Sequence, residues 1–273
     1  IIMLKLKFVL ILLVGLLVSC SGSSEHQSTT KKTALDYNFL WNFSEIKEVS
    51  YSYEMTSIDK ETYVRNSDAH TMKTEVKGDL RVSSGGDLSA TLSLENAEKT
   101  IFSLTDEGEW SPANPQHMGK SPIGELTQYS RFNDERLDAI WDAYLPLPLE
   151  EIKMGESYKL GMSQPVGMEA NKYLHGFNTL NFTGYETIQN RKCIVLSGDI
   201  VLTDVDDLDF EGDYTHTMHG KGTYYFDPKE HIYVKADVEI TRVKKLDSGE
   251  NPDVKKDLFM DRTITERFKM ILK

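Results

Sequence analysis

The chain has 273 residues, of which 39% are hydrophobic, 10% aromatic and 27% charged. This composition is typical of a folded globular protein, because a disordered chain would contain fewer aromatic and β-branched residues. The formal net charge of −12 at pH 7 argues against nucleic acid as a partner, since neutralising phosphates requires a basic surface.

The first twenty residues have the pattern of an export signal. Lys5 and Lys7 precede an apolar run from Phe8 to Val18, which is too short for the roughly 20 residues that a membrane-spanning helix needs. The run ends in Leu17-Val18-Ser19-Cys20, which resembles a bacterial lipobox. The resemblance implies that residues 1–19 are a cleaved signal peptide and that Cys20 is lipidated. An ordinary secretory signal is the alternative.

Residues 20–33 are polar and rich in Ser and Thr, which predicts a lipidated flexible tether with a reach of roughly 20 Å. Two or three acyl chains give stable membrane attachment, where one chain would be marginal. Ser21 follows Cys20, and by resemblance to enterobacterial sorting this favours the outer membrane. We expect a lipid-anchored protein of the bacterial outer membrane, with the periplasmic face favoured over the cell surface.

The chain has two cysteines, and Cys20 is expected to carry the lipid. Cys193 is then unable to form an intramolecular disulfide, even in an oxidising compartment. It begins the apolar stretch Cys193-Ile194-Val195-Leu196, which predicts a buried strand. We therefore expect a reduced thiol in the core rather than a nucleophile.

Period-two alternation of apolar and polar residues dominates the body of the chain. The clearest case is Ile232 to Thr241, where every second residue is apolar. Such strands bury one face and expose the other, as antiparallel sheets do. Turn residues at 84–87 and 227–230 predict two hairpins. Strands are predicted over 49–56, 70–83, 88–95, 99–105, 157–163, 177–188, 192–203, 213–226, 232–241 and 257–271.

One amphipathic helix is predicted between these strands. Asn133 or Asp134 can cap it, prolines at 146 and 148 end it, and an i, i+3, i+4, i+7 stripe runs along one side. The stripe consists of Leu137, Ile140, Trp141 and Tyr144.

The predicted fold is mainly β, with a long curved antiparallel sheet, like a half-barrel, and this helix packed on its concave face. A β-sandwich is the alternative. Residues 34–273 are expected to form a single β-rich domain. Two similar halves joined near residues 145–149 are the other possible division.

Three stretches carry a resemblance to a known group of proteins. They are residues 147–158, with Leu-Pro followed by Gly-Glu-Ser-Tyr, residues 185–193, with Tyr-Glu before Arg-Lys-Cys, and residues 222–229, with Gly-Thr-Tyr-Tyr-Phe-Asp-Pro-Lys. Together with the lipobox, they resemble uncharacterised β-rich lipoproteins of Bacteroidota, over about residues 145–245. The resemblance implies an envelope location and a fold class, and it assigns no catalytic residues.

An acidic stretch is the strongest metal candidate. Every second residue from 207 to 213 is acidic, and Gly212 precedes the last of them; the four are Asp207, Asp209, Glu211 and Asp213. This spacing mimics the start of a calcium loop. Met218 occupies the position where that loop needs a bidentate Glu, so a solvated acidic strand connection is the alternative. Downstream, the odd separation of His216 and His219 places them on opposite faces of a strand, which argues against a shared zinc ion.

No motif of an enzyme stands out, since the sequence lacks a nucleophile elbow, a metalloprotease helix and a glycine-rich phosphate loop. We therefore expect a non-enzymatic envelope lipoprotein, with no cofactor unless calcium binds. Its predicted role is to bind an apolar or amphiphilic ligand, such as a lipid, in a cavity that Leu137, Ile140, Trp141 and Tyr144 line. The alternative is an interaction or assembly lipoprotein that presents an acidic face to an envelope protein and holds no ligand.

Overall fold

The computed structural model describes residues 48–63, 66–86, 89–105, 108–112, 115–127, 142–148, 152–165, 173–205, 214–246 and 259–273. All of these belong to the second of two compact units, Asp36–Lys273. The first unit, Ile1–Leu35, lies outside the described residues. The signal peptide, the tether and lipidation of Cys20 therefore stay predictions.

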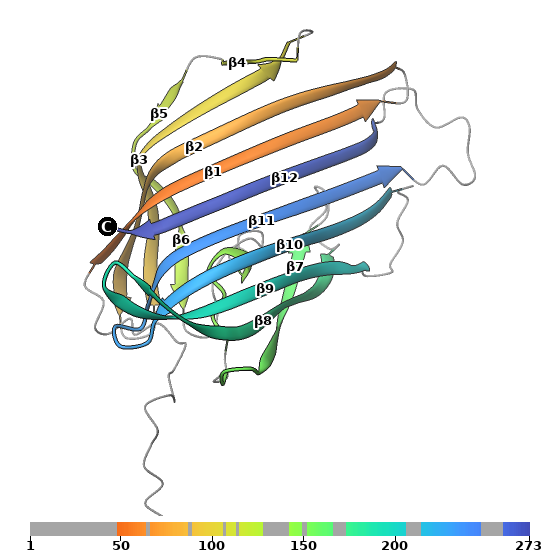
Figure 1. Ribbon diagram of the computed structural model, residues 1–273. Coiled ribbons are helices and arrows are strands. Elements are labelled where there is room, and N and C mark those ends of the chain that lie inside the picture. Colours follow the sequence, from red (N-terminus) through yellow and green to blue (C-terminus); the bar gives the residue numbers. More distant parts are fainter. Residues whose placement is uncertain are drawn as a thin grey trace, which may run out of the picture. The chain divides into compact units, whose positions relative to one another are not determined.

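The described strands form one antiparallel sheet of 12 strands (Figure 1). Their order across the sheet is β4-β3-β2-β1-β12-β11-β10-β9-β8-β7, and β5 and β6 also pair with β3. The strands are β1 (Glu48–Tyr63), β2 (Asn66–Gly86), β3 (Ser89–Leu104), β4 (Trp110–Pro112), β5 (Gln116–Met118), β6 (Ser121–Thr127), β7 (Ser157–Pro165), β8 (Tyr173–Ile188), β9 (Arg191–Val205), β10 (Tyr214–Asp227), β11 (Ile232–Leu246) and β12 (Phe259–Leu272).

The last strand, β12, pairs with both the first strand, β1, and the strand before it, β11. Successive strands pair as hairpins from β1 to β3 and from β7 to β11, and β12 lies between β1 and β11 (Figure 1). Its pairing with β1 runs from Tyr51↔Leu272 to Tyr63↔Phe259. The last strand of the sequence is thus in the interior of the sheet.

The mainly β, antiparallel prediction is confirmed, and the β-sandwich alternative is wrong because the described strands share one sheet. The strands predicted at 88–95 and 99–105 are one strand, β3. It is interrupted where Asn96, with a φ of 51°, lies in an irregular register opposite Gly78. The short strands β4, β5 and β6 were not predicted, because so few residues show no alternation.

The predicted amphipathic helix is not supported by the described residues. In this part of the chain only Asp142–Tyr144 is helical, a single turn that Pro146 and Pro148 cannot extend. Leu137, Ile140 and Trp141 lie outside the described residues. Nowhere in the described ranges is there a helix long and apolar enough to cross a membrane.

The core lies on one face of the sheet, which we call the core face. Alternate residues of the central strands point to it, and the largest of these are fully buried. They include Tyr51, Leu80, Leu92, Leu196, Tyr224 and Phe268. Cys193 is buried and unpaired, as predicted, and burial raises the pKa of its thiol to about 11.

Residues Asp142–Pro148, here called the crossing segment, pack against the core face and are all buried. Their backbone carbonyls accept hydrogen bonds from side chains of the sheet. Tyr224 Oη donates to the carbonyl of Ala143, and Tyr233 Oη donates to that of Pro146. Buried irregular backbone needs such partners, so these phenols fix where the segment lies.

Two glycines make the space for the Tyr224 ring. Gly222 on β10 pairs with Gly198 on β9, and a Cβ at Gly198 would lie 2.6 Å from Asn178 Oδ1 and 3.0 Å from Tyr224 Cε2. A Cβ at Gly222 would overlap the phenol of Tyr224 itself. The ring therefore lies flat on the sheet and points its hydroxyl at the crossing segment.

The sheet curves between β9 and β12. Gln189, in the β8–β9 turn, donates from Nε2 to the carbonyl of Leu272 on β12 at 2.7 Å. Strands β10 and β11 lie between β9 and β12, so these strands would be about 14 Å apart in a flat sheet. A glutamine side chain cannot span that distance, and this curvature agrees with the predicted curved sheet.

The Tyr224 ring fills the space above Gly222, so adding a single methyl group at this position should destabilise the fold. We expect Gly222→Ala to lower the free energy of unfolding by about 1 to 3 kcal/mol, because the ring of Tyr224 must move and its bond to Ala143 weakens. Gly161→Ala in β7 is the matched control, since a Cβ there meets nothing within 4 Å. Urea unfolding of both variants measures the difference, and equal midpoints would refute this account of Tyr224.

Candidate functional site

Of the residues predicted to line a ligand cavity or to bind calcium, only Tyr144 lies within the described ranges. Tyr144 is buried, and its ring stacks on Phe268 at 4.4 Å between centroids. The predicted calcium ligands Asp207, Asp209, Glu211 and Asp213 lie outside the described residues. In the ranges that are described, no group of three or more His, Cys, Asp or Glu side chains could hold a metal ion.

The two histidines of β10 behave as predicted. His216 has the strand parity of the buried Met218 and Tyr224, and it is half-buried, whereas His219 is exposed. They therefore lie on opposite faces of the sheet. The ligand cavity predicted from Leu137, Ile140, Trp141 and Tyr144 stays a prediction, because three of these residues lie outside the described ranges.

The core face changes from apolar to charged along the length of its central strands. Cross-strand partners Val238 and Phe268 belong to an apolar row. Three rows follow toward the other end of the strands, and each carries ionisable groups on the same face. We call the ionisable groups that β1, β10, β11 and β12 contribute to these rows the charged end; they are Asp59, Glu61, His216, Arg242, Lys244, Arg262 and Glu266.

Arg262 on β12 binds two carboxylates of β1. Its Nε and Nη2 donate to the two oxygens of Asp59 at 3.1 and 2.6 Å, and its Nε lies 3.0 Å from Glu61 Oε1. Tyr63 Oη donates to the other oxygen of Glu61 at 2.7 Å. This bidentate geometry holds the guanidinium firmly, and hydrogen bonding to Asp59 raises the pKa of Arg262.

A second ion pair joins β11 and β12. Arg242 Nη2 donates to Glu266 Oε2, and the two side chains are 24% and 15% exposed. Arg242 Nε is buried, and none of the described residues offers it a hydrogen-bond acceptor. Leaving such a donor unsatisfied costs stability.

His216 and Lys244 are direct cross-strand partners on β10 and β11. Desolvation, followed by the charge of Lys244, lowers the pKa of His216 to about 4. Desolvation, followed by the charge of Arg262, lowers the pKa of Lys244. At pH 7 His216 is therefore uncharged. The cations of this end are Arg242, Lys244 and Arg262, and its carboxylates are Asp59 and Glu61 on β1 and Glu266 on β12.

The sequence analysis missed the charged end, although a signal for it exists. The period-two set of Phe268, Met270 and Leu272 continues backwards through Glu266 and Arg262. The alternation of side-chain direction does not stop where the residues become charged. A pattern of apolar residues cannot show that a strand continues once its residues become charged. The prediction therefore ended this strand at Thr56, whereas β1 continues to Tyr63.

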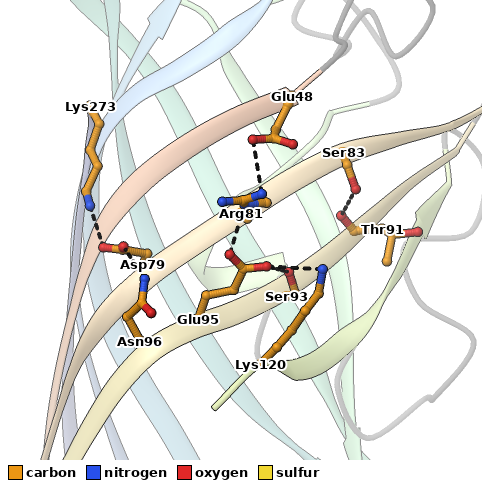
Figure 2. Close-up of polar contacts among 10 residues, drawn as sticks. All are labelled: Glu48, Asp79, Arg81, Ser83, Thr91, Ser93, Glu95, Asn96, Lys120 and Lys273. Atoms are coloured by element: carbon orange, nitrogen blue, oxygen red, sulfur yellow. Dashed lines mark hydrogen bonds and ion pairs between the residues drawn. The ribbon is translucent and has the colours of Figure 1, made fainter. Parts of the chain in front are cut away.

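The opposite face of β1, β2 and β3 carries balanced ion pairs rather than a block of acids (Figure 2). Arg81 contacts both Glu48 and Glu95, and Lys120 also contacts Glu95. Lys273 at the C-terminus contacts Asp79 at 2.5 Å. On these strands, most of the acidic charge is compensated locally.

No family model matches the chain, and no curated protein matches it. Among solved structures, the chain is similar to a "putative outer membrane lipoprotein-sorting protein domain" from Vibrio parahaemolyticus, with 10% identity, a TM-score of 0.14, and coverage of 83% of this chain and 86% of that chain. It is also similar to a DUF1329 family protein from Desulfovibrio piger, with 9% identity, a TM-score of 0.14, and coverage of 83% and 85%. TM-scores this low carry no argument about function.

The low pKa of His216 predicts a pH-dependent stability. Because its folded pKa of about 4 lies below its ordinary value of 6.5, the unfolded chain binds a proton between these values and the folded chain does not. The free energy of unfolding should therefore fall from pH 6.5 toward pH 4, by about 1 to 2 kcal/mol from this half-buried group.

Urea unfolding at pH 7 and pH 5 measures this effect. His216→Gln should flatten the pH dependence, and the exposed His219→Gln should not. The interpretation is wrong if His216→Gln unfolds with the same pH dependence as the unmodified protein.

Proposed function

We propose that this protein is a membrane-anchored envelope lipoprotein that binds an amphiphilic ligand on its core face and catalyses no reaction. The observation that carries the proposal is the change along that face from buried aromatic residues to a half-buried charged end. An amphiphile has the same two parts, and a binding site for it needs an apolar surface beside convergent polar groups.

The apolar part of the ligand is assigned to the region around the crossing segment. Tyr144 and Phe268 stack there, and Tyr53 contacts Phe268 edge to face at 5.4 Å. Ile140 and Trp141 directly precede this segment in the sequence, and the proposal assigns them to the same apolar region. These residues would supply the apolar contacts.

The polar part of the ligand is assigned to the charged end. Its side chains are only partly exposed, at 19% for Asp59 and 37% for Arg262, so they keep some contact with solvent on a face that is otherwise core. Partial desolvation strengthens electrostatic contacts, and a headgroup bound there would meet oriented charges.

The location follows from the proposed lipidation of Cys20. Acyl chains on this residue would hold the protein at the outer membrane, with the β-rich unit in the periplasm. The short tether would keep the sheet within about 20 Å of the membrane surface, which suits a protein that takes up or delivers membrane amphiphiles.

The ligand-binding proposal is favoured over an assembly role with an acidic face. The described outer surface of β1, β2 and β3 pairs its acids with Arg81, Lys120 and Lys273, which leaves little net charge to attract a basic partner. Protein partners in the envelope are therefore the second candidate.

Native mass spectrometry tests the proposal directly. Residues 21–273, which leave out the predicted signal and the cysteine predicted to be lipidated, are purified without detergent. We expect an extra mass of a few hundred daltons that is lost on denaturation. A bare polypeptide mass, together with no binding of added amphiphiles, would support the assembly role instead.

Trp141→Ala tests the apolar part of the site. We expect this variant to bind N-phenyl-1-naphthylamine, a neutral probe that fluoresces in apolar surroundings, about tenfold more weakly, because it loses a large aromatic contact. Trp110→Ala in β4 is the matched control and should bind the probe normally. Equal loss of thermal stability in both variants with unchanged binding would exclude Trp141 from the site.

A further inference from the structure

The apolar part of the core face is closed in this structure. Large apolar residues that β8, β9, β11 and β12 direct to this face are 0% exposed; they include Leu180, Leu196, Ile200, Val238 and Phe268. An alkyl chain bound there would have to contact carbon surface that is now covered by other parts of the protein. If the core face binds an amphiphile, part of its cover must therefore move.

The crossing segment supplies part of this cover. The ring of Tyr144 stacks on Phe268 of β12, and Leu145 and Leu147 are each 3% exposed. The backbone of the segment is bonded to side chains of β8, β10 and β11. The segment thus contacts four strands of the face to which the proposed function assigns the alkyl chain.

Three buried side chains of the sheet hold the segment by its carbonyl oxygens. Asn178 Nδ2 donates to the carbonyl of Asp142 at 3.2 Å, and Tyr224 and Tyr233 donate to those of Ala143 and Pro146. These three bonds are separate from the hydrogen bonds that pair the strands. Breaking them releases the carbonyls and leaves the pairing of the sheet intact.

Asn178 has the properties of a positioning residue for this segment. It is fully buried on β8, two residues from Leu180 on the same face. Its Oδ1 is buried, and none of the described residues donates a hydrogen bond to it. An apolar residue at this position would avoid the cost of an unsatisfied acceptor. The bonds that its Nδ2 makes to Asp142 and to Tyr224 Oη are what the amide contributes here.

We propose that the crossing segment is a displaceable cover over the apolar part of the ligand site, and that Asn178, Tyr224 and Tyr233 set the affinity for the ligand by holding it closed. This inference rests on the proposed function and adds the conformational change and the residues that control it. The ligand binds the open state, so its apparent affinity is reduced by the fraction of molecules that are open. Weaker closure therefore gives tighter binding.

Two conservative variants test the sign of this effect. Residues 21–273 are titrated with N-phenyl-1-naphthylamine and its fluorescence is measured. We expect Tyr224→Phe and Tyr233→Phe each to bind the probe about fivefold more tightly, because the closed state loses one buried hydrogen bond. Tyr225→Phe is the matched control and should leave the affinity unchanged. Its half-buried side chain lies on the other face of β10, where its hydroxyl hydrogen-bonds with Glu186.

Asn178→Leu separates closure from the stability of the sheet. This variant loses the bond to Asp142 and also the buried Oδ1 that has no donor among the described residues. We expect tighter probe binding, again about fivefold, with little change in the urea midpoint. Urea unfolding of the tyrosine variants confirms that they fold.

Hydrogen exchange measures the displacement itself. With the probe at saturation, the amides of Ala143, Tyr144, Leu145 and Leu147 should exchange faster than in the free protein, because the segment leaves the core face. Amides in the middle of β10 should not exchange faster. Slower or unchanged exchange in the segment would show that the probe binds without displacing it, and the inference would be wrong.

The outcomes separate this inference from the proposed function. If the two tyrosine variants bind the probe more weakly, the phenols contact the ligand directly. If they bind it with unchanged affinity, closure does not control binding. Either result overturns the inference while amphiphile binding stands. If neither the unmodified protein nor any variant binds the probe or another added amphiphile, the proposed function fails and the inference fails with it.

Discussion

The pairing of β12 between β1 and β11 is the constraint on which the rest of the structure depends. This strand hydrogen-bonds to both neighbours over most of its length, so it joins the N-terminal strands to the C-terminal hairpins. It also carries Phe268, on which the crossing segment packs, and Arg262 and Glu266, which link the charges of β1 to those of β11. A single strand thus supplies the centre of the core and the centre of the charged end.

A second set of constraints fixes the crossing segment. It has almost no regular structure, so its carbonyls must find donors in the sheet. Tyr224 and Tyr233 supply them, and glycines beneath Tyr224 give its ring the space to lie flat. Gly222, Tyr224 and Phe226 therefore have separate physical roles within one stretch of β10. Gly222 leaves space for the Tyr224 ring, the Tyr224 hydroxyl donates a hydrogen bond to the crossing segment, and the Phe226 ring packs in the core.

Alternation predicted most of the sheet, because a strand with one buried face records that face in every second residue. The hairpin at 227–230 was also predictable, since Asp227 accepts from the backbone of Lys229 and Glu230 in the turn. The pairing of β1 with β12 was not, because it joins residues about 200 positions apart and no local pattern encodes it. The helix prediction is not supported where the chain is described, because only Asp142–Tyr144 is helical. A local stripe cannot reveal that the carbonyls of Ala143 and Pro146 are held by tyrosines of the sheet.

The charged end bears on function because charged side chains on a partly desolvated face lower the stability of the fold relative to apolar ones. Ion pairs on a partly desolvated face are seldom more stabilising than apolar residues of similar volume, and the same strands use Val238, Phe268 and Met270 a few residues away. A sheet selected for stability alone would continue that apolar pattern to its end. Arg242 instead places a largely buried guanidinium there, and its Nε has no acceptor among the described residues. A polar end on an otherwise apolar face is therefore better accounted for by the proposed binding of an amphiphile than by stability alone.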